Sequence, residues 1–129
     1  MKKDIAFPKI ENVLVTVAKD NDTWNVYLLN RNEKTLDTVL VTSKGYGDLE
    51  GEDQKTSTLR HMIPQLEPNE YALIEPIDPQ VFHLNNEYWV SFFIDGQLFD
   101  KKYIFVPDSI VKNNLSFIPE LNMEGVLHE

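Results

Sequence analysis

Three histidines carry the widest chemical repertoire in this sequence, and their surroundings do not indicate a metal site. His61, His83 and His128 belong to no recognised metal-binding motif, and the chain has no cysteine to supply a thiolate ligand. His61 lies in a strand-like run and His83 in a short helical segment, where a hydrogen-bonded structural histidine is the expected role. We therefore predict no metal ion and no cofactor, with a zinc site built from distant residues as the alternative.

Three other patterns that could carry chemistry fail on spacing. The acidic run 48–53 has the composition of a calcium loop, but the twelfth position, where a helix–loop–helix site needs glutamate, is Leu59. In residues 43–47 a lysine precedes the glycines, the reverse of the order in a phosphate-binding loop. No serine occupies a Gly-x-Ser-x-Gly elbow. The sequence therefore predicts no catalytic residue.

Residues 43–58 form the candidate binding segment. They hold three of the five glycines, four acidic residues and almost no aliphatic side chain. At about 16 residues the segment is longer than most connections, so we expect a loop that is either mobile or functional. Tyr46, which stands between two glycines, is the first candidate binding residue, and Asp48, Arg60 and His61 are the next.

The elements that must position these residues are strands. Residues 88–106 contain two aromatic-rich runs around Asp95-Gly96, a pair typical of a type I′ turn, and this predicts a β-hairpin. Asp78-Pro79 predicts the start of a short helix over residues 79–86. The acidic tail is expected to form an edge strand or to stay loose. Further strands are predicted by β-branched runs or period-two patterns at 13–17, 23–29, 36–42, 59–63, 71–75 and within 110–118.

Together these elements predict an all-β fold. Seven or eight short strands with polar turns and one short helix are typical of an antiparallel β-sandwich. At 129 residues, the chain is long enough for one domain with a single core. We expect one domain over residues 1–129, with 1–9 and 122–129 as its more flexible ends.

The charge of the chain disfavours several classes of partner. The net charge is −9, and residues 61–129 hold 3 basic against 11 acidic side chains. A surface of this sign repels phosphate backbones and anionic membranes, so nucleic-acid binding and membrane docking are not expected. The sequence has no secretory-type apolar run behind its N-terminal lysines and no stretch long enough to cross a bilayer. A cytoplasmic location is the expectation.

The chain resembles a small family of Bacteroidetes proteins of about this length. The resemblance is carried by LDTVLVTSKGYG (36–47), TSTLRHMI (56–63), ALIEPI (72–77), HLNNEYWVSFFI (83–94), KKYIFVP (101–107) and FIPEL (117–121). The strand order and the FIPEL tail are also similar, more distantly, to the β-sandwich domain that accompanies Smr domains. This resemblance implies a β-sandwich. Members of the family are sometimes labelled phenylalanyl-tRNA synthetase subunits, but the chain has only two arginines, Arg31 and Arg60, and lacks the large ATP-binding sheet of a synthetase, so a synthetase-type role is not expected.

Three functional hypotheses follow. The first is a non-enzymatic interaction module that binds another protein at segment 43–58 or along an exposed edge strand. The second is a small hydrolase or cation-dependent activity built around residues 43–61. The third is a ligand-binding domain in which Trp24 or Trp89 stacks on a sugar or nucleobase, although alternating aromatics on strands are usually core residues.

Overall fold

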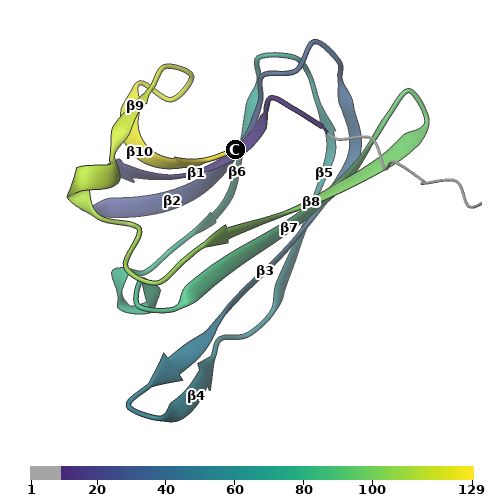
Figure 1. Cartoon of the computed structure of the whole chain (residues 1–129). Helices are drawn as coiled ribbons and strands as arrows, with labels where there is room; N and C mark the ends of the chain where they lie inside the picture. Colours follow the sequence, from purple (N-terminus) through teal and green to yellow (C-terminus); the bar gives the residue numbers. More distant parts are fainter. Residues whose placement is uncertain (1–9) are drawn as a thin grey trace, which may run out of the picture.

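The computed structural model describes residues 10–129, so the predicted flexible segment 1–9 lies outside the described residues. Ten strands and two single 3₁₀ turns account for the regular structure in this range. The strands form two antiparallel sheets that pack face to face (Figure 1). Their bounds are β1 Val13–Asp20, β2 Thr23–Asn30, β3 Leu36–Leu49, β4 Glu52–Lys55, β5 Leu59–Leu66, β6 Tyr71–Pro76, β7 Asn85–Ile94, β8 Gln97–Phe105, β9 Ser116–Ile118 and β10 Met123–His128.

The predicted all-β, antiparallel, sandwich-like fold is confirmed, but the strand count of seven or eight is wrong. The first sheet has the order β6-β2-β1-β10-β9, and the second has the order β4-β3-β7-β8 with β5 also paired to β3. The two strands beyond the predicted eight are β4, which arises inside the segment expected to be a loop, and β10, which is the tail. The described residues contain no helix with the length and apolar character that a bilayer crossing requires.

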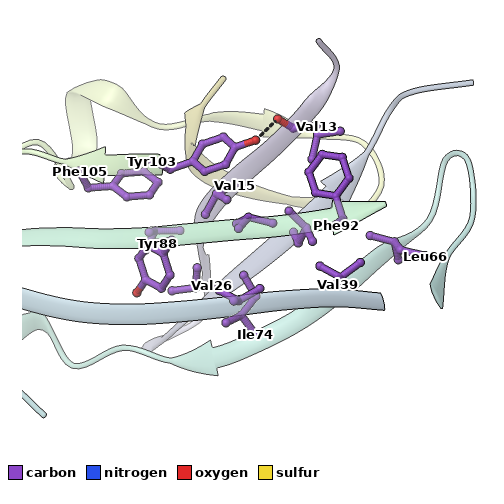
Figure 2. Packing of buried hydrophobic residues seen from close by; sticks show 14 of the residues in the cluster. Val13, Val15, Val26, Val39, Leu66, Ile74, Tyr88, Phe92, Tyr103 and Phe105 are labelled. Carbon is purple, nitrogen blue, oxygen red and sulfur yellow. Dashed lines mark hydrogen bonds between the residues drawn. The ribbon is translucent and has the colours of Figure 1, made fainter. Parts of the chain in front are cut away.

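The main core lies between the two sheets and follows the period-two pattern. In β1, Val13, Val15 and Val17 face inward, and in β3 Val39 and Val41 do so as predicted. Figure 2 shows aromatic side chains of the second sheet, Phe92 and Tyr103 among them, beside Val13 and Val15 of β1, with the Tyr103 hydroxyl donating a hydrogen bond to the carbonyl of Val13. This bond joins β8 to β1 across the core and satisfies the one polar atom of a buried ring.

The hairpin at 88–106 is confirmed. Strands β7 and β8 pair without interruption, and Asp95 and Gly96 have φ angles of 49° and 79°. Positive φ at both central residues is the requirement of a type I′ turn, whose twist matches that of the strands it joins. This hairpin supplies two of the five strands of the second sheet and fixes the faces on which their side chains lie.

The predicted helix over 79–86 is only a single 3₁₀ turn, η1, at Pro79–Val81. Its start is as predicted, because the Asp78 carboxylate accepts a hydrogen bond from the Gln80 amide at 2.9 Å. The chain then makes one more i to i+3 turn, in which the Leu84 amide donates to the Val81 carbonyl. The Asn86 side-chain amide also donates to the carbonyls of Val81 and Leu84, and β7 begins at Asn85.

The end of β5 and the position of the tail also differ from the prediction. Strand β5 continues past Pro64 to Leu66, which is possible because β5 is an edge strand and Pro64 lies where Thr38 bulges out of β3 with a φ of 48°. The tail is neither loose nor an edge. Strand β10 pairs with β1 on one side and β9 on the other, so it lies inside the first sheet. The predicted short strand within 110–118 is β9.

Candidate functional site

The segment predicted as a loop, 43–58, is mostly a hairpin. Strand β3 runs on to Leu49, a turn at Glu50 and Gly51 follows with φ angles of 52° and 83°, and β4 returns antiparallel to it. Figure 1 shows this hairpin extending away from the body of the sandwich. The loop prediction was wrong because charged residues and glycines hide the alternation of this strand. The signal for a turn in the sequence was the Glu50-Gly51 pair, and the structure shows a positive φ at both positions.

Tyr46 and Asp48 lie on the same side of this hairpin, and each has a local partner. The Tyr46 hydroxyl donates to Glu87 Oε1 at 3.1 Å, and the Lys44 ammonium lies 5.7 Å from the centre of the Tyr46 ring. Partial burial and then the Glu87 carboxylate raise the pKa of Tyr46. These contacts give Tyr46 a structural role on the hairpin, and its predicted role in binding stays a prediction. Asp48 lies opposite Asp53, and the interaction with this second carboxyl group raises the pKa of Asp48.

Arg60 and His61 are neighbours in β5, so their side chains point to opposite faces of the second sheet. Arg60 lies on the outer face beside Thr42. His61 points inward, and its Nε2 lies 2.7 Å from Glu75 Oε1 on β6, which fits the structural role expected of this histidine. The four predicted site residues therefore divide among three places: the projecting hairpin, the outer face and the space between the sheets.

Glu75, which the sequence did not single out, is the centre of the inner group. Its side chain is 12% exposed, and its Oε1 also accepts from the Ser43 hydroxyl at 2.8 Å. The Tyr88 hydroxyl lies 3.4 Å from Oε2. Both the serine and the histidine contact the carboxylate rather than each other, so the arrangement lacks the serine–histidine bond that activates a nucleophile. The group joins the two sheets through a carboxylate.

A pocket of about 380 Å³ opens beside Glu75. Its walls come from the inner face of β3 and β7, the start of β5, the end of β6 and the η1 turn. The candidate segment thus does line a concave surface, through Ser43, Lys44 and Gly45 of strand β3 and through Thr56 and Ser57 of the connection that follows β4. His61 contributes through Glu75 and not as a wall of the pocket itself. Residues 10–129 contain no group of three His, Asp or Glu side chains placed to hold a metal ion.

The outer face of the second sheet is the other unusual surface. Five large apolar side chains are exposed there, with Met62 62%, Leu98 56% and Trp89 46% accessible, and Leu40 and Phe93 completing the set. We call these five residues the outer apolar face. Met62 pairs with Leu40 and Phe93 with Leu98, while Leu40 lies diagonally between Phe93 and Trp89. Neighbouring positions of this kind bring side chains into one patch.

The pattern that marks this face was present in the sequence. Strands β3 and β7 carry apolar side chains at consecutive positions, as in Val39-Leu40-Val41 and Phe92-Phe93. Strands with one wet face alternate apolar and polar residues, whereas strands covered on both faces read as continuous apolar runs. Strands β3 and β7 follow the continuous pattern, which predicts that a partner covers the outer side of the sheet. Trp24, by contrast, is half-buried and packs edge-on against Phe82 at 5.2 Å, as a core aromatic would.

The open edges of both sheets are poorly suited to strand addition. Edge strand β5 contains Pro64, and β8 turns Lys101 toward the inner side, where its ammonium lies 5.0 Å from the centre of the Tyr103 ring. Edge strand β6 has a register shift, an inward Glu75 and a terminal Pro76. Prolines, inward charges and bulges are the devices that keep edge strands from pairing with other chains. The remaining edge strands, β4 and β9, have four and three residues.

Comparison with known proteins adds no relative. No family model matches the chain, and no curated protein matches it significantly. The resemblance to the Bacteroidetes family therefore stays a prediction, and the functional argument depends on the geometry of these surfaces.

Proposed function

We propose that this protein is a non-enzymatic interaction module and that its outer apolar face, not an edge strand or the 43–58 segment, binds another protein. The observation that carries the proposal is the cluster of five large exposed apolar side chains on one open sheet face. Single exposed apolar residues are normal, but a contiguous patch on a soluble protein is typical of a binding surface. The protected edge strands favour binding on the sheet face over binding by addition of a partner strand.

The chemistry of the partner follows from the charges around this face. Arg60, Thr42, Trp89 and Lys102 lie side by side across β5, β3, β7 and β8, and the Lys102 ammonium lies 5.0 Å from the centre of the Trp89 ring. Two cations therefore flank the central tryptophan, in a chain whose net charge is −9. Of the acidic residues on the same face, Glu87 is buried against Tyr46 and Lys44, and Asp100 lies two positions before Lys102 on β8. We infer that the partner presents a segment with apolar and acidic side chains. The apolar ones would cover the patch and the acidic ones would meet Arg60 and Lys102.

Trp89 is the expected hot spot, because a central aromatic side chain usually dominates such an interface. Trp89→Ser is expected to weaken partner binding at least tenfold, and to lower the free energy of unfolding by only about 2 kcal/mol because Trp89 is 46% exposed. The measurement is selection of peptides from a displayed random library on the wild-type protein, followed by titration of selected peptides against each variant.

Leu73→Ser is the matched control. Leu73 is a 56% exposed apolar residue on β6, in the other sheet, and its replacement is expected to leave peptide binding unchanged. Selected peptides should be rich in acidic and apolar residues. The proposal is wrong if the peptides are basic, if Trp89→Ser binds them as tightly as wild type, or if the protein self-associates through this face in light scattering.

A further inference from the structure

The pocket beside Glu75 is a second site, independent of the outer apolar face. It lies on the inner side of the second sheet, where β3 and β7 approach the end of β6, and holds about 380 Å³. This volume is in the range of small-molecule sites, which are concave and contain a few fixed polar groups. Its lining is mixed: aliphatic side chains of Leu59, Ile77 and Val81 lie near the Glu75 carboxylate.

Most polar side chains of the pocket are already paired within the protein. The Asn86 amide donates to two backbone carbonyls, and the Thr56 hydroxyl accepts from the Gly45 amide and donates to the Ser57 carbonyl. Two charged residues of the lining also have partners: the Lys44 ammonium lies 3.8 Å from Glu87 Oε2, and the exposed Asp78 carboxylate accepts from the Gln80 amide at 2.9 Å.

Glu75 is the partly buried carboxylate of the pocket, and one of its oxygens has capacity left. Its Oε1 has two short contacts, but its Oε2 has only the 3.4 Å contact with the Tyr88 hydroxyl. An ionised carboxylate has about four acceptor positions, so Oε2 has capacity for a further donor.

A partly buried carboxylate with free acceptor capacity selects a donor-rich cation. Glu75 is only 12% exposed, so its charge is screened by water less than that of a surface glutamate. The net charge of −9 also draws cations toward the protein. An anionic or purely acceptor-type ligand would meet the carboxylate unfavourably.

We propose that this pocket binds a small organic cation, with an ammonium or guanidinium group on Glu75 Oε2 and a short carbon chain along Leu59, Ile77 and Val81. The carboxylate provides the charge-assisted hydrogen bond, and the aliphatic wall removes the chain of the ligand from water. Ser43 and His61 hold the carboxylate in place through Oε1. No bond is made or broken in this role.

The test uses n-butylammonium and n-butylguanidinium as probes, with n-butanol and butyrate as neutral and anionic analogues of the same length. Binding is followed by amide chemical shifts of the whole chain in two-dimensional NMR. Both cations are expected to shift residues 43–45 and 75–78 saturably, with dissociation constants of about millimolar for probes of this size. The alcohol and the carboxylate are expected to bind at least tenfold more weakly.

Glu75→Gln keeps the shape of the side chain and removes its charge, and it is expected to weaken cation binding at least tenfold. Glu52→Gln, on an exposed position of β4, is the matched control and should bind normally. Because Glu75 also makes contacts between the sheets, Leu59→Lys serves as a second variant. It changes a rim residue that is 48% exposed, is expected to keep the fold, and places an ammonium where the probe would bind. The proposal is overturned if butanol shifts the same amides as strongly, or if both variants bind like wild type.

Discussion

Gly125→Ala is expected to destabilise the protein by about 3 kcal/mol, a large part of the 5–15 kcal/mol that stabilises a typical domain. A Cβ at this position would lie 2.5 Å from Thr16 Oγ1, 3.1 Å from the Val17 carbonyl oxygen and 3.2 Å from Ala18 Cα. Strand β10 is held between β1 and β9, so it cannot move away without breaking pairs on one side. The buried Thr16 hydroxyl, which donates to the Val126 carbonyl, would also lose its place.

Chemical denaturation measures this effect, with Gly47→Ala as the matched control. At Gly47 the nearest atom to an added Cβ is Leu84 Cδ2 at 3.4 Å, an ordinary contact, so this variant should stay close to wild type in stability. Adding Thr16→Ala to Gly125→Ala removes the closest contact and should recover part of the loss, which a double-mutant cycle would quantify. Equal stability of Gly125→Ala and wild type would show that β10 is not tightly packed inside the sheet.

The strands with a clean pattern were predictable from sequence, and those that depend on distant residues were not. The Asp95-Gly96 pair and the β-branched or alternating runs at 13–17 and 36–42 reflect local backbone preference directly, so the predicted hairpin and these two strands are confirmed. The tail at Met123–His128 carries no such local signal, because its place inside the sheet is set by β1, more than 100 residues earlier. The helix predicted over 79–86 is cut short because the second half of that segment enters β7, which begins at Asn85 and pairs with β3 and β8.

The candidate site was predictable only in part, because two of its determinants are relations between strands. Arg60 and His61 are adjacent in sequence but face opposite ways, and only the pairing of β5 with β3 places Arg60 on the outer side. Glu75 gains its role from Ser43 and His61, which are 32 and 14 residues away in the chain. The outer apolar face, however, was readable from the consecutive apolar residues in β3 and β7. The sequence interpretation instead took alternating aromatics on strands as usual core residues, with Trp89 as a candidate for stacking on a ligand.

Two buried tyrosines are expected to make the protein unfold steeply in alkali. Burial, with a smaller contribution from the Glu75 carboxylate, raises the pKa of Tyr88 far above its ordinary value of 10.0, and burial alone does the same for Tyr103. The folded protein therefore keeps both phenols protonated, while the unfolded chain releases both protons above pH 10. Stability is unaffected below pH 10 and falls as the pH rises beyond it, by about 1.4 kcal/mol per pH unit for each tyrosine.

Tyr88→Phe separates this titration from the loss of a contact. The hydroxyl of Tyr88 makes only the 3.4 Å contact with Glu75, whereas that of Tyr103 satisfies the Val13 carbonyl, so Tyr88→Phe has the smaller cost near neutral pH. Because phenylalanine has no proton to release, the variant should lose stability more slowly than wild type in alkali and become the more stable protein above about pH 11. Urea unfolding between about pH 8 and 11.5, with tyrosinate absorbance as a second probe, measures the crossover. Parallel curves for the two proteins over this range would mean that the Tyr88 hydroxyl is open to solvent, and that the two sheets do not close over it as the packing around Glu75 requires.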